Sequence, residues 1–239
     1  MKKILILIPL VFIAVTGIQT VTRSAQACAQ DPSTLQMAGG LKDALLQGTS
    51  KSTVQLSAVN GFFGNAAVKI LFPPEAQKAE KTLRRIGLNS LCDKVILSMN
   101  RAAEDAAKQA EPIFVDAIKH MSFTDVTNIL LGKQDAATQY FKRTTTAQLI
   151  AKFKPVIKVS LDKVGATKYY STAAGEYNKL PFVSHINPDI TDYATQKAID
   201  GIFVEIALEE LNIRKNISVR STPLMKTAFS FADKVKKGL

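Results

Sequence analysis

The feature that most constrains the fold is the spacing of apolar residues, which follows the helical period along nearly all of the chain after residue 40. Apolar residues that recur every three or four positions form one face of a helix, whereas strict alternation is typical of a strand. Breaks such as Pro73-Pro74, Gly87 and Gly132 divide the pattern at short intervals. No repeat of fixed period, as in a solenoid, is present. The pattern predicts a single all-α domain of about eight helices with short connections.

Within this domain the clearest helix runs from Ile190 to Lys215. Between Asp135 and Val164 we expect two or three helical pieces, because Thr144-Thr145-Thr146 and Pro155 weaken a continuous helix. Two short stretches are the strand candidates, Val68–Phe72 and Ile217–Arg220. If they are strands, they form one minor two-stranded pairing.

The N-terminus has the layout of a secretory signal peptide. Lys2 and Lys3 precede the apolar run Ile4–Val15, and polar residues then lead to Ala25-Gln26-Ala27. The run is shorter than the roughly 20 apolar residues of a membrane-spanning helix, and Pro9 interrupts it. We therefore expect a periplasmic or envelope-associated protein with no transmembrane segment after cleavage; the alternative is an uncleaved N-terminal anchor.

The cleavage site has two readings. Cleavage after Ala27 makes Cys28 the first mature residue, which is the lipid-bearing position of a bacterial lipoprotein. A lipoprotein signal has Leu three residues before that cysteine, where this chain has Ala25, so ordinary cleavage after Ala27 or Ala29 is the alternative. The predicted organisation is a signal peptide (1–27), a mature N-terminal tail (28–39) and a single α-helical domain (40–239).

Composition excludes several classes of protein. Two Cys and two His among 239 residues cannot make a disulfide-dense scaffold, a Cys-rich zinc module or a multi-His metal centre. Cys92 falls in a helical apolar pattern, which predicts a buried, inert thiol. Asp116 and His120 are one helical turn apart, but a metal needs three or four ligands, so we expect a surface pair. P-loop, nucleophile-elbow, zinc-protease and dinucleotide-binding motifs are missing, and we predict no metal and no cofactor.

Two local clusters have both a functional and a structural interpretation. His185, Asp189 and Asp192 could support acid–base chemistry or bind a cation, whereas capping of the following helix by Asn187 or Asp189 is the structural explanation. Phe62 and Phe63 could form a loop or lid over a ligand or dip into a membrane surface. Because large aromatic side chains are usually buried, a role in filling the core is favoured.

Charge is the most informative functional feature. The formal net charge is +11, and the stretch from Lys142 to Lys168 holds seven Lys and Arg but a single acid, Asp162. This stretch predicts a face for an anionic ligand, formed by Lys142, Arg143, Lys152, Lys154 and Lys158. The alternative is a solvated helix face without a partner. In an exported protein, the anionic partner would be phospholipid, lipopolysaccharide or cell-wall polymer, and no nucleic acid is expected.

Several longer motifs resemble an uncharacterised bacterial envelope family, the domain of unknown function 4197, over about residues 40–229. The motifs are Gly40–Leu45, Gly61–Asn65, Asn100–Glu104, Asp135–Phe141 and Asn187–Tyr193. The resemblance implies a single exported α-rich domain, and it implies no activity and no catalytic residue. We therefore expect a non-enzymatic envelope protein that binds an apolar or anionic envelope ligand. The alternative is an enzyme with an unrecognised site near His185, Asp189 and Asp192.

Overall fold

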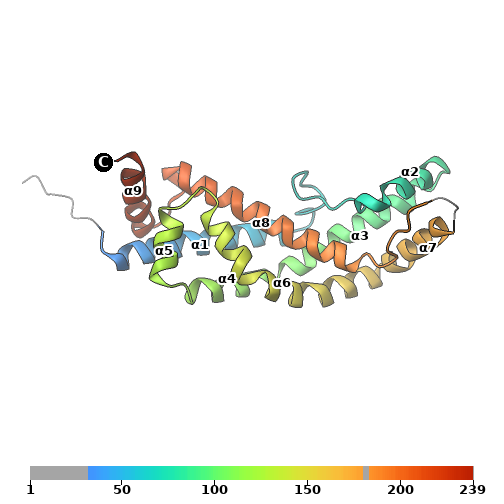
Figure 1. Cartoon of the computed structure of the whole chain (residues 1–239), viewed down its shortest axis with the longest axis horizontal. Coiled ribbons are helices and arrows are strands. Elements are labelled where there is room, and N and C mark those ends of the chain that lie inside the picture. Colours follow the sequence, from blue (N-terminus) through green and yellow to red (C-terminus); the bar gives the residue numbers. More distant parts are fainter. Residues whose placement is uncertain (1–31, 180–182, 239) are drawn as a thin grey trace, which may run out of the picture. The chain divides into compact units, whose positions relative to one another are not determined.

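Helices make up most of the computed structural model, which describes residues 32–179 and 183–238 (Figure 1). These residues form nine α-helices, two short 3-10 helices and no strand, and from Pro32 onward the chain is one compact unit. In chain order the elements are α1 (Thr34–Ser57), η1 (Pro74–Ala76), α2 (Gln77–Arg85), α3 (Asn89–Ala107), α4 (Ala110–Lys119), α5 (Phe123–Leu130), α6 (Ala136–Lys163), α7 (Ala166–Asn178), α8 (Thr191–Lys215), η2 (Ile217–Val219) and α9 (Pro223–Lys237). The predicted all-α domain is confirmed, with nine α-helices where about eight are predicted. The predicted signal peptide and Cys28 lie outside the described residues.

The predicted strand pairing between Val68–Phe72 and Ile217–Arg220 is wrong. The Asn100 side chain accepts from the Ile70 N–H (2.9 Å) and donates to the Ile70 C=O (2.8 Å), so a side chain of α3 stands where a neighbouring strand would be. The second stretch is instead the 3-10 helix η2, followed by the buried Arg220.

The predicted division of the 135–164 region is also wrong, because α6 is one continuous helix of 28 residues. The hydroxyls of Thr144, Thr145 and Thr146 donate to carbonyls one turn earlier in the same helix, at 3.0, 2.6 and 2.6 Å. Pro155 lies on the exposed side of the helix. The buried row that continues on both sides of Pro155 holds the helix together across this position.

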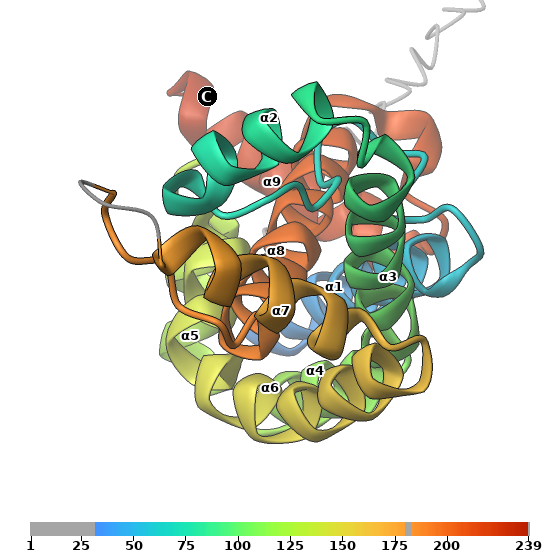
Figure 2. The ribbon, with the colours of Figure 1, turned by 90° about the vertical axis from the view of Figure 1, so that its right-hand side faces the viewer.

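Rows of buried residues spaced by four explain how the long helices pack. On α6 the row consists of Ala137, Phe141, Thr145, Leu149, Phe153, Ile157 and Leu161. Residues spaced by four turn by about 40° around the helix axis at each step. They form ridges on the helix surface, and helices that pack through such ridges cross at about 50°. One helix can therefore contact several partners in succession, and α6 packs against α8, α3, α4 and α7. α8 lies among α1, α3 and α6 (Figure 2).

Helix α9 closes on α1 at a position that only glycine allows. A Cβ on Gly40 would lie 2.2 Å from the Leu224 C=O oxygen and 2.7 Å from the Ala228 Cβ. The Thr222 hydroxyl, which caps α9, also donates to the Asp43 carboxylate of α1 at 2.8 Å. Gly40 therefore permits the close contact between α1 and α9.

Candidate functional site: the outer face of α6

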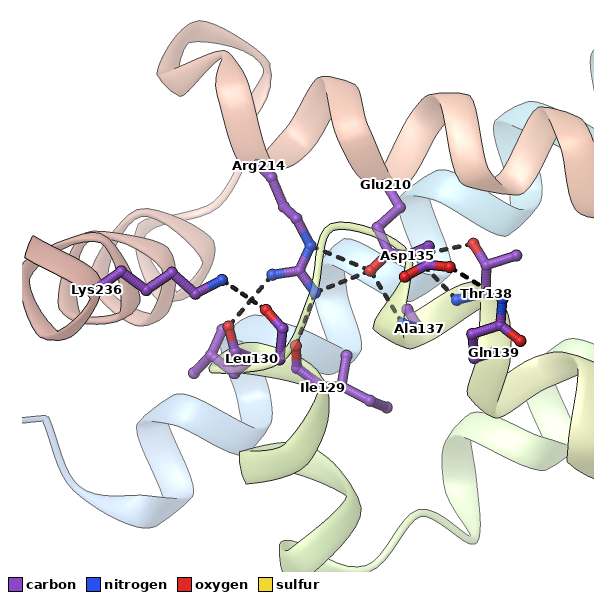
Figure 3. Close-up of polar contacts among 10 residues, drawn as sticks. Ile129, Leu130, Asp135, Ala137, Thr138, Gln139, Glu210, Arg214 and Lys236 are labelled. Carbon is purple, nitrogen blue, oxygen red and sulfur yellow. Dashed lines mark hydrogen bonds and ion pairs between the residues drawn. The ribbon is translucent and has the colours of Figure 1, made fainter.

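The position of α6 is set at its N-terminus by a buried carboxylate from α8 (Figure 3). Glu210 accepts hydrogen bonds from the Ala137 N–H, the Thr138 N–H and the Thr138 hydroxyl, each at 2.9 Å. The local N-cap residue, Asp135, makes no capping hydrogen bond with its side chain. Because the first N–H groups of a helix have no partner inside the helix, Glu210 caps α6 from another element.

A second residue of α8, Arg214, binds the end of α5 and forms an ion pair with Glu210. Arg214 donates to the carbonyls of Ile129 (2.7 Å) and Leu130 (3.2 Å) and to Glu210 (2.8 Å). The Lys236 ammonium of α9 donates a hydrogen bond to the Gly132 C=O at 2.7 Å (Figure 3). The pKa of Lys236 is lowered, mainly because the ammonium is partly removed from solvent. Glu210 thus holds α6 and Arg214 holds α5 against α8, and the contacts of this ion pair are explained by its structural role.

Two of the five basic residues predicted to form an anionic-ligand face have an acidic partner. Lys154 pairs with Asp192 at 2.6 Å and Lys158 with Asp162 at 2.9 Å, and each carboxylate raises the pKa of its lysine. Lys142 and Arg143 are exposed near the other end of α6, and the Lys142 Nζ lies 5.8 Å from the centre of the Phe203 ring.

Lys152 lies on the opposite flank of α6 and has no ion pair within the described part of the chain. It begins a set of residues spaced three or four apart, which places them on one side of the helix. We name this set the α6 strip: Lys152, Pro155, Val156, Val159 and Lys163.

The α6 strip combines unpaired cations with exposed apolar surface. Pro155, Val156, Val159 and Lys163 line a shallow groove of about 480 Å³, and Val159 is 52% exposed. No ion pair involves Lys163 among residues 32–179 and 183–238. Asp105 of α3, an acid that lines the groove, is bound by Lys108 and by the Ser160 hydroxyl.

The turn that joins α6 to α7, together with the first residues of α7, continues this character. Val164 in the turn is 53% exposed, and Lys168 and Tyr169 (47% exposed) at the start of α7 are exposed beside it in sequence. Gly165 has a φ of +67°, which permits the tight turn. Lysines, small aliphatic side chains and a tyrosine are the residue types that proteins place at a lipid–water interface.

The two aromatics of the loop at 61–65 have different places. Phe62 is fully buried, and a Cβ on Gly201 of α8 would lie 2.5 Å from its ring. Phe63 is half-buried, and the Lys69 Nζ lies 4.0 Å from the centre of its ring. In this structure Phe62 fills the core between the loop and α8.

Sequence reasoning missed the partner of this loop. Glu104 of α3 accepts from the N–H groups of Phe62 (3.1 Å) and Phe63 (3.2 Å), and Arg101 donates to Glu104 and to Asn60. The spacing of 101 and 104 on one helix face is the only local signal for this arrangement. Two motifs of the resemblance, Gly61–Asn65 and Asn100–Glu104, thus bind each other.

The cluster of His185, Asp189 and Asp192 is divided among separate contacts. The Asp189 carboxylate accepts from the Thr191 N–H at 2.8 Å, which lowers the pKa of Asp189. Asp192 is the partner of Lys154, and His185 is exposed. An enzyme site at these residues stays a prediction.

The other titratable candidates are surface or core residues. Asp116 and His120 are both exposed, with His120 Nδ1 3.4 Å from the Asp116 carboxylate, and they border an open hollow with Arg143. No group of three or more metal-ligating side chains occurs among the residues that the structure describes. Cys92 is fully buried, and burial raises the pKa of its thiol.

No helix in the described residues has both the length and the apolar character needed to cross a membrane. Comparison with the curated proteins found no match, and neither did comparison with the solved structures. One family model, described as "Protein of unknown function (DUF4197)", matches residues 31–230. Since the match covers most of the chain, from before α1 into α9, the protein belongs to the DUF4197 family.

Proposed function

We propose that this protein is a non-enzymatic, exported helical protein that docks on an anionic lipid surface of the bacterial envelope through the α6 strip and the adjoining turn. The observation that carries the proposal is the alternation of exposed apolar residues with three lysines, Lys152, Lys163 and Lys168, that have no ion pair in the described part of the chain. The N-terminal signal layout supports an envelope location.

The expected binding is weak and sensitive to salt. Each lysine near an anionic membrane contributes about 1 kcal/mol, so three lysines acting together contribute roughly 3 kcal/mol. Burial of apolar surface adds roughly 25 cal/mol per Å². Val159, Val164 and Tyr169 supply this surface, since each is about half exposed. The electrostatic part decreases with salt because the Debye length shrinks from about 10 Å at 0.1 M to about 3 Å at 1 M.

Vesicle co-sedimentation tests the proposal. The full chain without residues 1–27 is mixed with phosphatidylcholine vesicles that contain or lack phosphatidylglycerol. We expect binding only to the anionic vesicles at 0.1 M salt, and loss of that binding at 1 M salt. Reversal of Lys152, Lys163 and Lys168 to Glu should weaken binding at least 100-fold, in line with roughly 3 kcal/mol.

The matched control reverses three other exposed lysines, Lys94, Lys215 and Lys226, which changes the net charge by the same amount. This control should retain most of the binding. Equal losses in the two triple variants would mean that net charge alone attracts the protein to vesicles, and the proposed strip would then be wrong. A wild-type protein that does not bind anionic vesicles would reject the proposed function altogether.

A further inference from the structure

The stretch from Lys69 to Phe72 belongs to no helix, and it has no strand partner among the residues that the structure describes. Burial alternates along it, with Ile70 and Phe72 buried and Leu71 52% exposed. Asn100 binds both the N–H and the C=O of Ile70 through one side chain. In an extended backbone the N–H and the C=O of one residue point in the same direction. The edge of the segment that carries the Ile70 N–H and C=O therefore faces α3.

The other edge of the segment has free backbone groups. In an extended chain the N–H and C=O of successive residues point to opposite sides, so those of Leu71 point away from Asn100. Among the described residues, the Leu71 N–H, the Leu71 C=O and the Lys69 C=O have no hydrogen-bond partner, whereas the Lys69 N–H donates to the Asn65 C=O. Three unpaired backbone groups therefore occur in sequence on one edge.

This edge borders an open groove of about 430 Å³ between the segment and α8. Leu71, Tyr193, Lys197, Gly201 and Val204 are among the residues that line it. Gly201 contributes no side chain, and Val204 is 39% exposed. The Tyr193 hydroxyl contacts the Phe72 C=O at 3.5 Å, where the groove approaches Pro73-Pro74.

We propose that this edge binds an extended peptide segment of a partner protein by β-strand addition. The peptide backbone would donate to the Leu71 C=O and the Lys69 C=O and accept from the Leu71 N–H, which makes three main-chain hydrogen bonds. An apolar side chain of the peptide would enter the groove against Tyr193 and Val204. An extended backbone is the occupant because it offers donors and acceptors at the spacing of a strand edge, which a lipid does not.

The proposal is independent of membrane docking, since the α6 strip and this edge have no residue in common.

The two ends of the segment limit how many peptide residues can bind. Pro73 has no N–H, and the turn at 65–68 ends the segment on the other side, so the edge accepts only about three peptide residues.

The test selects linear heptapeptides from a displayed random library on the immobilised full chain without residues 1–27. Selected peptides are then measured against four proteins: wild type, Leu71→Ala, Leu71→Pro and Val204→Lys. Leu71→Pro removes the N–H that the peptide must accept, Leu71→Ala keeps that N–H, and Val204→Lys places a long charged side chain at the groove.

We expect Leu71→Pro and Val204→Lys to weaken binding at least 10-fold and Leu71→Ala to weaken it less than 3-fold. N-methylation of the peptide at the backbone positions that donate should abolish binding, while methylation of the alternate positions should not. Hydrogen exchange should slow at the Leu71 amide when peptide is bound. Circular dichroism and thermal melting verify that each variant is folded, and Val204→Lys, a surface change, keeps the test decisive if Leu71→Pro does not fold.

Two results would overturn the proposal. The first is a failure to enrich peptides on the wild type relative to Val204→Lys. The second is peptide binding that is unaffected by both Leu71→Pro and N-methylation, which would show contact through side chains alone.

Discussion

The contact between α1 and α9 predicts opposite effects for the same substitution at two glycines of one helix. Gly40 and Gly48 both lie within α1, where replacement of Gly by Ala favours the helix by about 1 kcal/mol. At Gly48 the nearest atoms to a new Cβ would be 3.7 and 3.8 Å away, which is ordinary contact. At Gly40 the Leu224 carbonyl oxygen would lie only 2.2 Å from it.

The magnitude follows from the displacement that the new methyl group requires. α9 must move by more than 1 Å to restore ordinary contact at 3.4 Å or beyond. Overpacking of this kind costs about 1–3 kcal/mol, and the hydrogen bond from Thr222 to Asp43 would lose about 1 kcal/mol more. After the helix-propensity gain is subtracted, Gly40→Ala should lower the free energy of unfolding by about 2 kcal/mol, whereas Gly48→Ala should raise it by about 0.5–1 kcal/mol.

Urea denaturation followed by circular dichroism at a helical wavelength measures both values. For a domain of this size the melting temperature should fall by about 4–8 °C in Gly40→Ala and rise by about 2 °C in Gly48→Ala. The two variants have the same composition and the same host helix, so propensity cannot separate them. If Gly40→Ala is as stable as the wild type, the proposed close approach of α9 to α1 is incorrect.

Three further predictions concern titratable side chains. Glu210→Gln should lower the free energy of unfolding by about 3–5 kcal/mol in urea denaturation, because Arg214, whose side chain is only 9% exposed, then loses the carboxylate that balances its charge. The lowered pKa of Asp189 means that its hydrogen bond stabilises the protein above the unfolded-state pKa of about 3.9 and that this contribution is lost as the pH falls through the lower folded value. Asp189→Asn should therefore flatten the acid limb of a plot of stability against pH. Cys92 should react with a thiol reagent only at the rate of unfolding at pH 8, because it is buried and burial raises the pKa of its thiol; rapid labelling of the folded protein would contradict this burial.

Much of the fold could be predicted because its signals are local. The sequence Ser122-Phe123-Thr124-Asp125 has the spacing of a capping box, and the structure has that box at the start of α5. Thr222 caps α9, in which Pro223 is the first residue. The bounds of α8 differ from the predicted helix by one residue at its start. Where a local signal had two interpretations, it was less reliable. Asn89 and Ser90 are both residue types that commonly cap helices, yet Asn89 is the first helical residue of α3, and Leu88 stands at the N-cap without a side-chain hydrogen bond.

Other features depend on contacts that no local pattern contains. The continuity of α6 through Pro155 comes from its buried row, whose members pack against several helices. Glu104 and Glu210 bind backbone groups about 40 and 70 residues away in the chain. A sequence pattern shows that these carboxylates lie on helices, but it does not show which unpaired N–H groups they reach.

The candidate site shows the same division. The sequence by itself determined that cations gather between 142 and 168, because charge is a property of composition and survives any folding of the chain. Only the tertiary structure decided which of those cations have a partner on another helix. Asp192, on α8, neutralises Lys154, whereas Lys152 lies two residues earlier on the opposite flank and has no partner in the described part of the chain. The physical reason is that an ion pair needs two groups within a few ångströms, and that distance is set by how helices remote in sequence pack together.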